Sequence, residues 1–307
     1  MRIVFMGSPE FAVPSLEALL KCHEVLAVYT RADSVRGRGR TVIPTPVKSA
    51  AIEAGLTVEQ PTTLRDPDTV RRLAAYRPDV ICVAAYGMIL PPEVLAIPPL
   101  GCLNVHASML PRHRGAAPIH RAILDADEHT GVVIMRMEEG LDTGPFTALR
   151  TTKVGDKTVE SLSSELAVLG ADALIEALDA LAAGSVEWTA QDEASATYAA
   201  KMTDADVSLT PDLDVKSALR RVRASTSSAR SKIVACGRRV DVLVASPSNI
   251  MIAPGRVLHA GDDLVVGFAD GSLRLDVVRA EGRGAIEGHA FACGARIDAD
   301  EHWSSAE

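Results

Sequence analysis

The sequence is poor in aromatic residues and carries no excess of positive charge. Aromatic residues make up 4% of its 307 residues, and the formal net charge at pH 7 is −8. This net charge argues against a protein that binds polyanions over its whole surface. The hydrophobic content of 47% is ordinary for a globular protein, and the length predicts one large domain with a smaller one.

Paired cysteines and long apolar runs are also missing. The five cysteines are scattered, odd in number and never spaced Cys-x-x-Cys, which favours reduced thiols over a disulfide framework or a zinc site. No stretch approaches the roughly 18 apolar residues of a membrane span. The start, MRIVFMGSPEF, lacks the longer apolar run of a signal peptide. We therefore expect no membrane span and a location in the cytoplasm.

Short runs rich in Val and Ile alternate with helical patterns in the first part of the chain. Near-continuous apolar runs are typical of strands covered on both faces, and their alternation with helices predicts an α/β fold with a mostly parallel, Rossmann-like sheet. The strands are expected at residues 2–6, 24–30, 79–85, 101–107 and 131–137, and the helices at 15–22, 46–55, 66–76, 118–124 and 157–181.

The pattern changes after residue 184. Residues 185–213 are mixed and polar, and we interpret them as a linker. Four strand-like runs then follow between turn signals, at 239–245, 252–258, 263–268 and 273–279. They predict a smaller β-rich, OB-like barrel domain at 214–307, after a catalytic domain at 1–184.

Polar side chains stand at the end of the fourth expected strand. Asn104 and His106 are two residues apart, so both point to one face of the sheet. Ligands of such sheets bind beyond the carboxyl ends of the strands. A hydrogen-bonded core Asn and His is the ordinary alternative.

Several other chemistries fit this stretch poorly. His106, His113 and His120 are evenly spaced, but Pro111 interrupts any continuous helix, so no metal site is predicted. Ser108 is not in a Gly-x-Ser-x-Gly turn, and the first strand is not followed by the Gly-x-Gly-x-x-Gly of a dinucleotide site.

Asp142 lies in EEGLDTGP, between two glycines just after the fifth strand. An aspartate in such a loop is often only a turn former. We expect the loop to lie at the same sheet edge as His106, where the carboxylate could orient an imidazole or accept a proton. Asn104, His106 and Asp142 would then suit acyl transfer without a covalent nucleophile, since amide and imidazolium N–H groups can stabilise an oxyanion.

The stretch NVHASMLPRHRGAAPIH, together with GLDTG, resembles the signature of enzymes that formylate amines with 10-formyltetrahydrofolate. AAYGMILP at 84–91 and YAAKM at 198–202 extend the similarity, which is greatest to the methionyl-tRNA formyltransferases. The resemblance implies the formyltransferase fold, 10-formyltetrahydrofolate as co-substrate, no metal, and Asn104, His106 and Asp142 as the catalytic set. The folate-binding residues would be Tyr86, Gly87, Met88, Ile89, Leu90 and Ser108.

Basic residues are the candidates for contact with the acceptor. By resemblance, residues 31–48 form a Gly/Arg-rich loop that enters the acceptor arm of the tRNA, through Arg36, Arg38 and Arg40. Arg112 and Arg114 are further candidates. Residues 216–239 hold eight basic and no acidic residues, which predicts either a solvated helix face or a phosphate-binding patch.

The second domain departs from the tRNA-enzyme pattern, because RASTSSARSKI at 223–233 lacks the prolines and aromatics of the family. Three functions therefore stay open. The protein could formylate methionyl-tRNA, or a small amine such as a hydroxyornithine side chain for a siderophore or an amino sugar. The third is a folate- or RNA-binding module without turnover. We expect a monomer or a weak dimer.

Overall fold

The protein is described from a computed structural model, which covers residues 1–36, 41–297 and 301–306. The chain divides into two compact units. Unit 1 comprises Met1–Ile119, Glu128–Lys153 and Glu160–Ala199, and unit 2 comprises His120–Asp127, Val154–Val159 and Ala200–Glu307. The segment expected as a linker therefore divides at Ala199, and its first part is built into unit 1.

Unit 1 is an α/β structure. Its strands are β1 (Arg2–Gly7), β2 (Glu24–Tyr29), β3 (Ser34–Arg36), β4 (Thr41–Ile43), β5 (Val58–Glu59), β6 (Val80–Ala84), β7 (Cys102–His106), β8 (Arg114–Gly115), β9 (His129–Arg136), β10 (Phe146–Lys153) and β11 (Tyr198–Ala199). Its helices are η1 (Glu10–Ala12), α1 (Val13–Cys22), α2 (Pro46–Glu53), α3 (Pro67–Ala75), α4 (Pro92–Leu95), α6 (Val159–Ala182) and η2 (Glu193–Ser195); α5 (Pro118–Leu124) starts here.

The main sheet of unit 1 is mostly parallel, as predicted. Among the described residues it has seven strands in the order β10-β9-β7-β6-β1-β2-β5. All neighbours from β7 to β5 are parallel, whereas β9 and β10 add an antiparallel edge. The expected strand at 131–137 is thus present but antiparallel. β10 was not expected, because FTALRTTK alternates in burial and has no compact apolar run.

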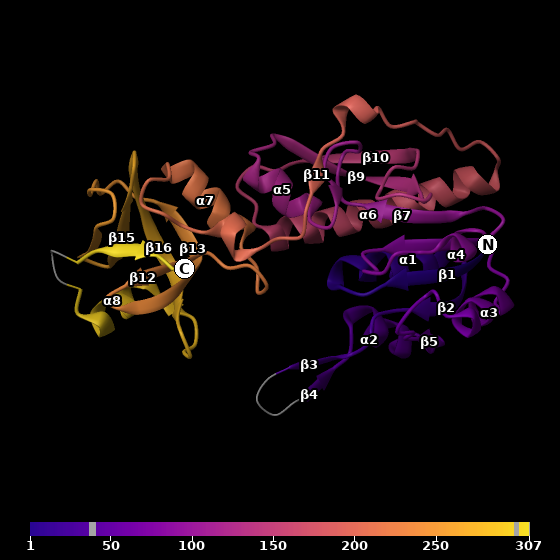
Figure 1. Ribbon diagram of the computed structural model, residues 1–307, viewed down its shortest axis with the longest axis horizontal. Coiled ribbons are helices and arrows are strands. Elements are labelled where there is room, and N and C mark those ends of the chain that lie inside the picture. The colour runs from indigo at the N-terminus through magenta and orange to yellow at the C-terminus, as the bar shows by residue number, and fades with distance from the viewer. Residues whose placement is uncertain (37–40, 298–300, 307) are drawn as a thin grey trace. The chain divides into compact units, whose positions relative to one another are not determined.

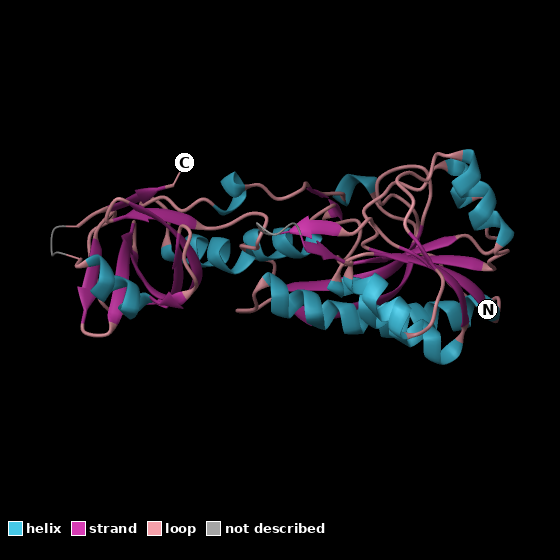
Figure 2. Cartoon of the chain, turned by 90° about the horizontal axis from the view of Figure 1, so that it is seen from below, coloured by secondary structure: helices cyan, strands magenta, loops and turns pink. Residues whose placement is uncertain are grey.

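Helices cover both faces of this sheet (Figure 2). On one face, Val4, Met6, Ile81 and Val83 pack with Leu73 of α3 and with other apolar side chains. On the other face, α6 approaches so closely that a Cβ built on Gly170 would lie 2.6 Å from Cγ1 of Val105. None of the helices in the described ranges is long and apolar enough to cross a membrane.

Two of the predicted helices begin at defined caps. Thr45 Oγ1 accepts a hydrogen bond from the Lys48 N–H, and Asp66 accepts from the backbone of the first turn of α3. Pro46 and Pro67 take the first helical positions, where a missing N–H is harmless. Local sequence therefore fixes where α2 and α3 start. The segment before α2 forms the β3–β4 hairpin, which projects from unit 1 (Figure 1).

Unit 2 is a small β structure with two helices of eight or more residues among its described residues. Its elements are η3 (Asp204–Val207), α7 (Val215–Ala224), β12 (Lys232–Ala235), β13 (Arg238–Pro247), β14 (Val257–Ala260), β15 (Asp263–Phe268), β16 (Gly271–Ala280), β17 (Ile286–Glu287), α8 (Gly288–Ala295) and β18 (Trp303–Ser305). The expected run at 252–258 becomes strand only from Val257, since Pro254 and Gly255 form a turn.

The strands of unit 2 curl into a barrel-like sheet around an apolar core. The order is β14-β15-β16-β13-β12-β18, and the bonded neighbours are antiparallel. Backbone hydrogen bonds from Val257 to Glu301 and from Trp303 to Gly255 join the two ends of this order. The indole of Trp303 lies inside, 3% exposed, against the ring of Phe268. The predicted β-rich, barrel-like domain is confirmed.

Gly170→Ala should destabilise the protein, although alanine favours helices. The new methyl would lie 2.6 Å from Val105 Cγ1 and 3.2 Å from Val132 Cγ2, and both belong to stiff β-branched side chains in the sheet. We expect a loss of about 1–3 kcal/mol in the free energy of unfolding, measured with urea. Val168→Ala, at an exposed position of the same helix, should change it by no more than about 0.5 kcal/mol. Equal stability of the two variants would contradict this packing.

Candidate active site

The carboxyl ends of β6 and β7 form one edge of the sheet, and His106 lies at this edge. The strands are parallel neighbours, with Val83 opposite Asn104. Asn104 and His106 share one face by strand alternation, the face opposite Val105 and α6. His106 is 4% exposed, so its imidazole is nearly removed from water.

Asp142 reaches His106 by a route that differs from the expected one. β9 is antiparallel to β7, and its end, Arg136, pairs with Leu103 near the amino end of β7. The β9–β10 loop therefore begins at the sheet edge opposite His106, and it must turn back across the sheet to bring Asp142 to His106. Asp142 Oδ2 ends 3.7 Å from His106 Nδ1, with the carboxylate side chain 14% exposed. The two residues meet as predicted, but through this folded loop.

Glycines make the returning loop possible. Gly140 has a φ of +128°, and a Cβ on Gly144 would lie 1.8 Å from the carbonyl oxygen of Arg136. Asp142 itself has a φ of 55°, a left-handed conformation that Asp tolerates better than most residues. Its Oδ2 accepts a hydrogen bond from the Gly115 N–H at 2.8 Å. Gly115 is also required, since a Cβ there would be 2.8 Å from the Ala199 carbonyl oxygen.

Gln191 holds the loop in place, although no motif or pattern in the sequence singles it out. Its Nε2 donates to the backbone oxygens of Asp142 at 2.8 Å and of Gly144 at 2.6 Å. Arg114 in turn donates to Gln191 Oε1 at 2.9 Å. The polar composition of residues 185–199 predicts a linker and does not distinguish Gln191 from its neighbours.

Arg114 was expected to be available to the acceptor, but it lies inside unit 1. Its side chain is 0% exposed, and its guanidinium binds the Glu193 carboxylate through two hydrogen bonds of 2.7 and 2.9 Å. Together with the β8–β11 pairing, this ties the stretch after β7 to residues 191–199. In this position Arg114 supports Gln191 rather than presenting a charge to solvent.

His106 is flanked by two acceptors. Its Nε2 lies 3.2 Å from the carbonyl oxygen of His113, and its Nδ1 faces Asp142. Burial lowers the pKa of His106, and the negative charge of Asp142 and the His113 carbonyl only partly offset this effect. A neutral imidazole has one ring proton for these two acceptors. Both neighbours would stabilise a second ring proton, whereas burial opposes it.

The segment after β6 borders the same edge. Ala85 and Gly87 have positive φ values of 45° and 79°, so the chain turns sharply there. Ile89 is 80% exposed, whereas Tyr86 and Leu90 are buried. Among the described residues, no backbone N–H from Tyr86 to Leu90 donates to another backbone group. The segment thus offers free amides beside an exposed apolar side chain.

The remaining predicted site residues lie in varied surroundings. Ser108 is fully buried, and its hydroxyl donates to the Arg112 carbonyl at 2.6 Å, which closes the turn after β7. Arg112 is exposed. Arg36 lies at the end of β3, while Arg38 and Arg40 fall outside the described residues. A shallow hollow lined by Met1, Lys21, His23 and Asp79, among others, lies at the amino end of β1, at the opposite edge from His106.

Several side chains of the basic segment 216–239 form contacts within unit 2. Lys232 Nζ lies 2.7 Å from Asp204, Arg223 donates to the Gly155 carbonyl, and Arg230 lies 3.7 Å from Asp241. The exposed members are Lys216, Arg238 and Arg239. The predicted helix face covers only the first part of this segment, which is α7. The rest of the segment includes β12 and the start of β13.

Comparison with known proteins decides the family. A family model described as formyl transferase matches residues 1–178. Methionyl-tRNA formyltransferase of Methylococcus capsulatus is 44% identical over 298 residues, covering 95% of this chain and 96% of that protein. The chain belongs to the methionyl-tRNA formyltransferase family. The enzyme of that name from Pseudomonas paraeruginosa is 46% identical over 278 residues and 90% of both chains.

Solved structures share the fold of this methionyl-tRNA formyltransferase family member. HypX from Aquifex aeolicus, in complex with tetrahydrofolic acid, has a TM-score of 0.69 at 22% identity, over 96% of this chain and 47% of that one. The sugar 3N-formyltransferase WlaRD has a TM-score of 0.64 at 13% identity, over 92% of this chain and 99% of that one. The predicted family and the predicted formyltransferase fold are thus confirmed.

Asp142→Asn should lower the pKa of His106 further. The substitution removes the negative charge that now favours the imidazolium, while the burial that disfavours it remains. The measurement is an NMR titration of the His106 ring resonances. Glu139→Gln removes the same charge from an exposed position of the same loop, where water and salt screen it, and should leave the His106 titration unchanged. A His106 pKa that rises or stays constant in Asp142→Asn would show that the carboxylate is not coupled to the ring.

Proposed function

We propose that this protein transfers the formyl group of 10-formyltetrahydrofolate to the amino group of methionyl-tRNA. The observation that carries the proposal is the pair of buried His106 and half-buried Asp142 at the carboxyl edge of a sheet whose fold is shared with solved formyltransferase structures. Identities of 42–46% to proteins named methionyl-tRNA formyltransferase, over at least 90% of the chain, favour this acceptor. Such an acceptor would place the reaction in the cytoplasm.

The folate-binding role of residues 86–90 is part of the proposal. Free backbone N–H groups can pair with the polar edge of a pterin ring, and the apolar side chain of Ile89 can cover its face. When bound, the folate supplies a formyl carbon that an amine can attack. Ser108 would act through the turn that it closes, since its hydroxyl is already bonded to Arg112.

The catalytic set would act on charge that develops during attack. Asn104 would donate a hydrogen bond to the formyl oxygen as it becomes negative, and His106 would donate another from Nε2 in place of its contact with the His113 carbonyl. The attacking amine forms the new C–N bond and passes one proton to the His106–Asp142 pair. The C–N bond to the folate then breaks, and the departing nitrogen regains a proton from this pair. No metal is assigned to any of these steps.

A neutral His106 suits this sequence of proton transfers. Burial keeps the ring uncharged before the reaction, so it can accept the proton, and Asp142 stabilises the resulting cation. The stabilisation is therefore greater in the transition state than in the ground state, which is the condition for faster turnover. Gln191 and Arg114 would contribute by holding the Asp142 backbone in place.

A small-molecule amine remains the second candidate acceptor. Unit 2 departs from the tRNA-enzyme sequence pattern at 223–233, and Lys232, Arg223 and Arg230 are engaged within the unit. Lys216, Arg238 and Arg239 are exposed in unit 2 and Arg112 in unit 1, and contacts of these side chains with phosphate stay a prediction. Arg36, Arg38 and Arg40 stay predictions for the acceptor arm, and a monomer or weak dimer stays the predicted assembly.

His106→Gln and Asp142→Ala should each lower kcat for formylation of methionyl-tRNA by at least about a hundredfold. Each removes a group that stabilises charge or receives the proton. Turnover is measured with purified 10-formyltetrahydrofolate and methionyl-tRNA, after circular dichroism has shown that the variant is folded. Glu139→Ala, in the same loop but exposed, should retain the kcat of the unchanged protein. Near-normal kcat in either site variant would refute the mechanism.

The acceptor is tested by salt dependence. If methionyl-tRNA is the substrate, kcat/KM should fall by about tenfold or more between 50 and 200 mM salt, because phosphate contacts release counterions. Amino sugars and hydroxyornithine are assayed in parallel under the same conditions. Formylation of a small amine with little salt dependence, and none of methionyl-tRNA, would establish the second candidate. Folate binding without any formylation would leave a binding module.

A further inference from the structure

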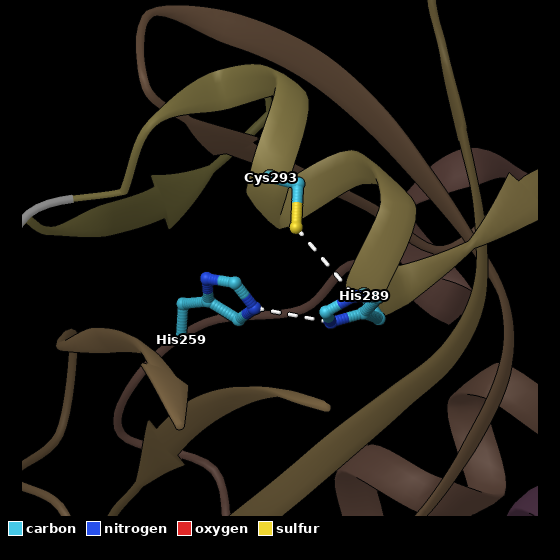
Figure 3. A group of neighbouring side chains, drawn as sticks. All are labelled: His259, His289 and Cys293. Atoms are coloured by element: carbon cyan, nitrogen blue, oxygen red, sulfur yellow. Dashed lines mark hydrogen bonds between the residues drawn. The ribbon is translucent and has the colours of Figure 1, made fainter. Parts of the chain in front are cut away.

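Three side chains that can ligate a metal converge in unit 2, outside the residues given a role above. His259 Nε2 lies 3.1 Å from His289 Nδ1, and Cys293 Sγ lies 3.6 Å from His289 Nε2 (Figure 3). One ligand atom from each of the three residues lies within 4.8 Å of the other two. The cluster combines two imidazoles with a thiol.

The fold sets these three positions independently of any ion. His289 and Cys293 are four residues apart in α8, so their side chains lie on one face of the helix. Phe291 and Ala292 are buried and anchor the helix. Gly288 allows the first turn of α8 to pack closely against β16, since a Cβ there would lie 1.9 Å from the Leu275 carbonyl oxygen. His259 faces this helix from β14.

Two separations in this cluster are close to the ligand separations of a tetrahedral zinc site. Bonds of about 2.0–2.1 Å from zinc to nitrogen and about 2.3 Å to sulfur place two nitrogens about 3.3 Å apart, and nitrogen and sulfur about 3.6 Å apart. The two observed separations, 3.1 and 3.6 Å, are close to these values. They involve different nitrogens of His289, however, and one ion uses only one of them. Closing the site therefore requires a rotation of Cys293 or His259, which are exposed and half-buried, respectively.

A carboxylate lies beside the three donor side chains. Asp262, in the turn between β14 and β15, places Oδ1 3.7 Å from His289 Nδ1. At 97% exposure its side chain is free to adjust, so it can take the fourth position or orient the imidazole. The ordinary alternative is a His–His hydrogen bond beside a surface thiol. That alternative needs one proton between the two imidazoles, and a cation can replace this proton.

We propose that His259, His289 and Cys293 bind one Zn²⁺ ion, with Asp262 or water as the fourth ligand. Two imidazoles and a thiolate select zinc over hard cations such as Mg²⁺ or Ca²⁺. Binding removes the thiol proton and exposes one nitrogen lone pair of each imidazole. Because the ligands come from β14 and α8, the ion joins the helix to the sheet of unit 2 and stabilises it. This site is separate from the proposed formyl transfer, in which no step uses it.

The test uses the full chain after treatment with a chelator. Zn²⁺ binding is measured by competition with a chromogenic chelator, and Co²⁺ is added as a spectroscopic probe. We expect one ion per chain, a thiolate-to-cobalt charge-transfer band, and a higher melting temperature with Zn²⁺. His259→Gln, His289→Gln and Cys293→Ser should each weaken Zn²⁺ binding at least about tenfold. Cys293→Ser should also remove the charge-transfer band.

Matched controls separate this site from adventitious binding. Cys22→Ser changes another exposed cysteine, and His129→Gln another exposed histidine, so both should leave the affinity and the spectrum unchanged. The proposal would be overturned if the three cluster variants bound Zn²⁺ as tightly as the unchanged protein, or if the cobalt complex of the unchanged protein lacked the thiolate band. Since no measurement depends on formylation, the result is independent of the proposed activity.

Discussion

The contact between Asp142 and His106 imposes most of the special features of unit 1. A carboxylate and an imidazole are costly to remove from water, so each needs partners where it is buried. Asp142 obtains the Gly115 N–H, and His106 obtains the His113 carbonyl. Both partners come from the stretch that follows β7, so this stretch must fold back against the returning β9–β10 loop.

That constraint explains residues that have no chemical role of their own. Gly115 must lack a side chain because the Ala199 carbonyl oxygen lies against it. Gly144 must lack one because the Arg136 carbonyl oxygen lies against it. Gln191 satisfies two carbonyls of the loop and is itself held by Arg114. A buried arginine is tolerated because Glu193 pairs with it through two hydrogen bonds. These side chains hold the Asp142 loop in one conformation, and the proposed catalytic role of the carboxylate would require such preorganisation.

Much of the architecture followed from local sequence. The apolar runs at 2–6, 79–85 and 101–107 became β1, β6 and β7, because strands covered on both faces leave an unmistakable pattern. Polar patterns were less informative. Residues 185–199 resemble a linker in composition, yet they pair with β8 and carry Gln191. Likewise, the distance in sequence between His259 and Cys293 hid a cluster that only the barrel brings together.

The sequence by itself determined the α/β class, the β-rich second domain and the family, because these depend on periodicity and on short motifs. It also singled out Asn104, His106 and Asp142, which stay the predicted catalytic set. Tertiary structure alone decided that β9 is antiparallel, that Asp142 returns across the sheet, and that Arg114 is buried instead of exposed. Strand direction and burial depend on contacts between residues far apart in the chain. Such contacts have no local signature. The sequence around a charged residue therefore does not show whether its side chain is solvated or paired with a carboxylate inside the fold.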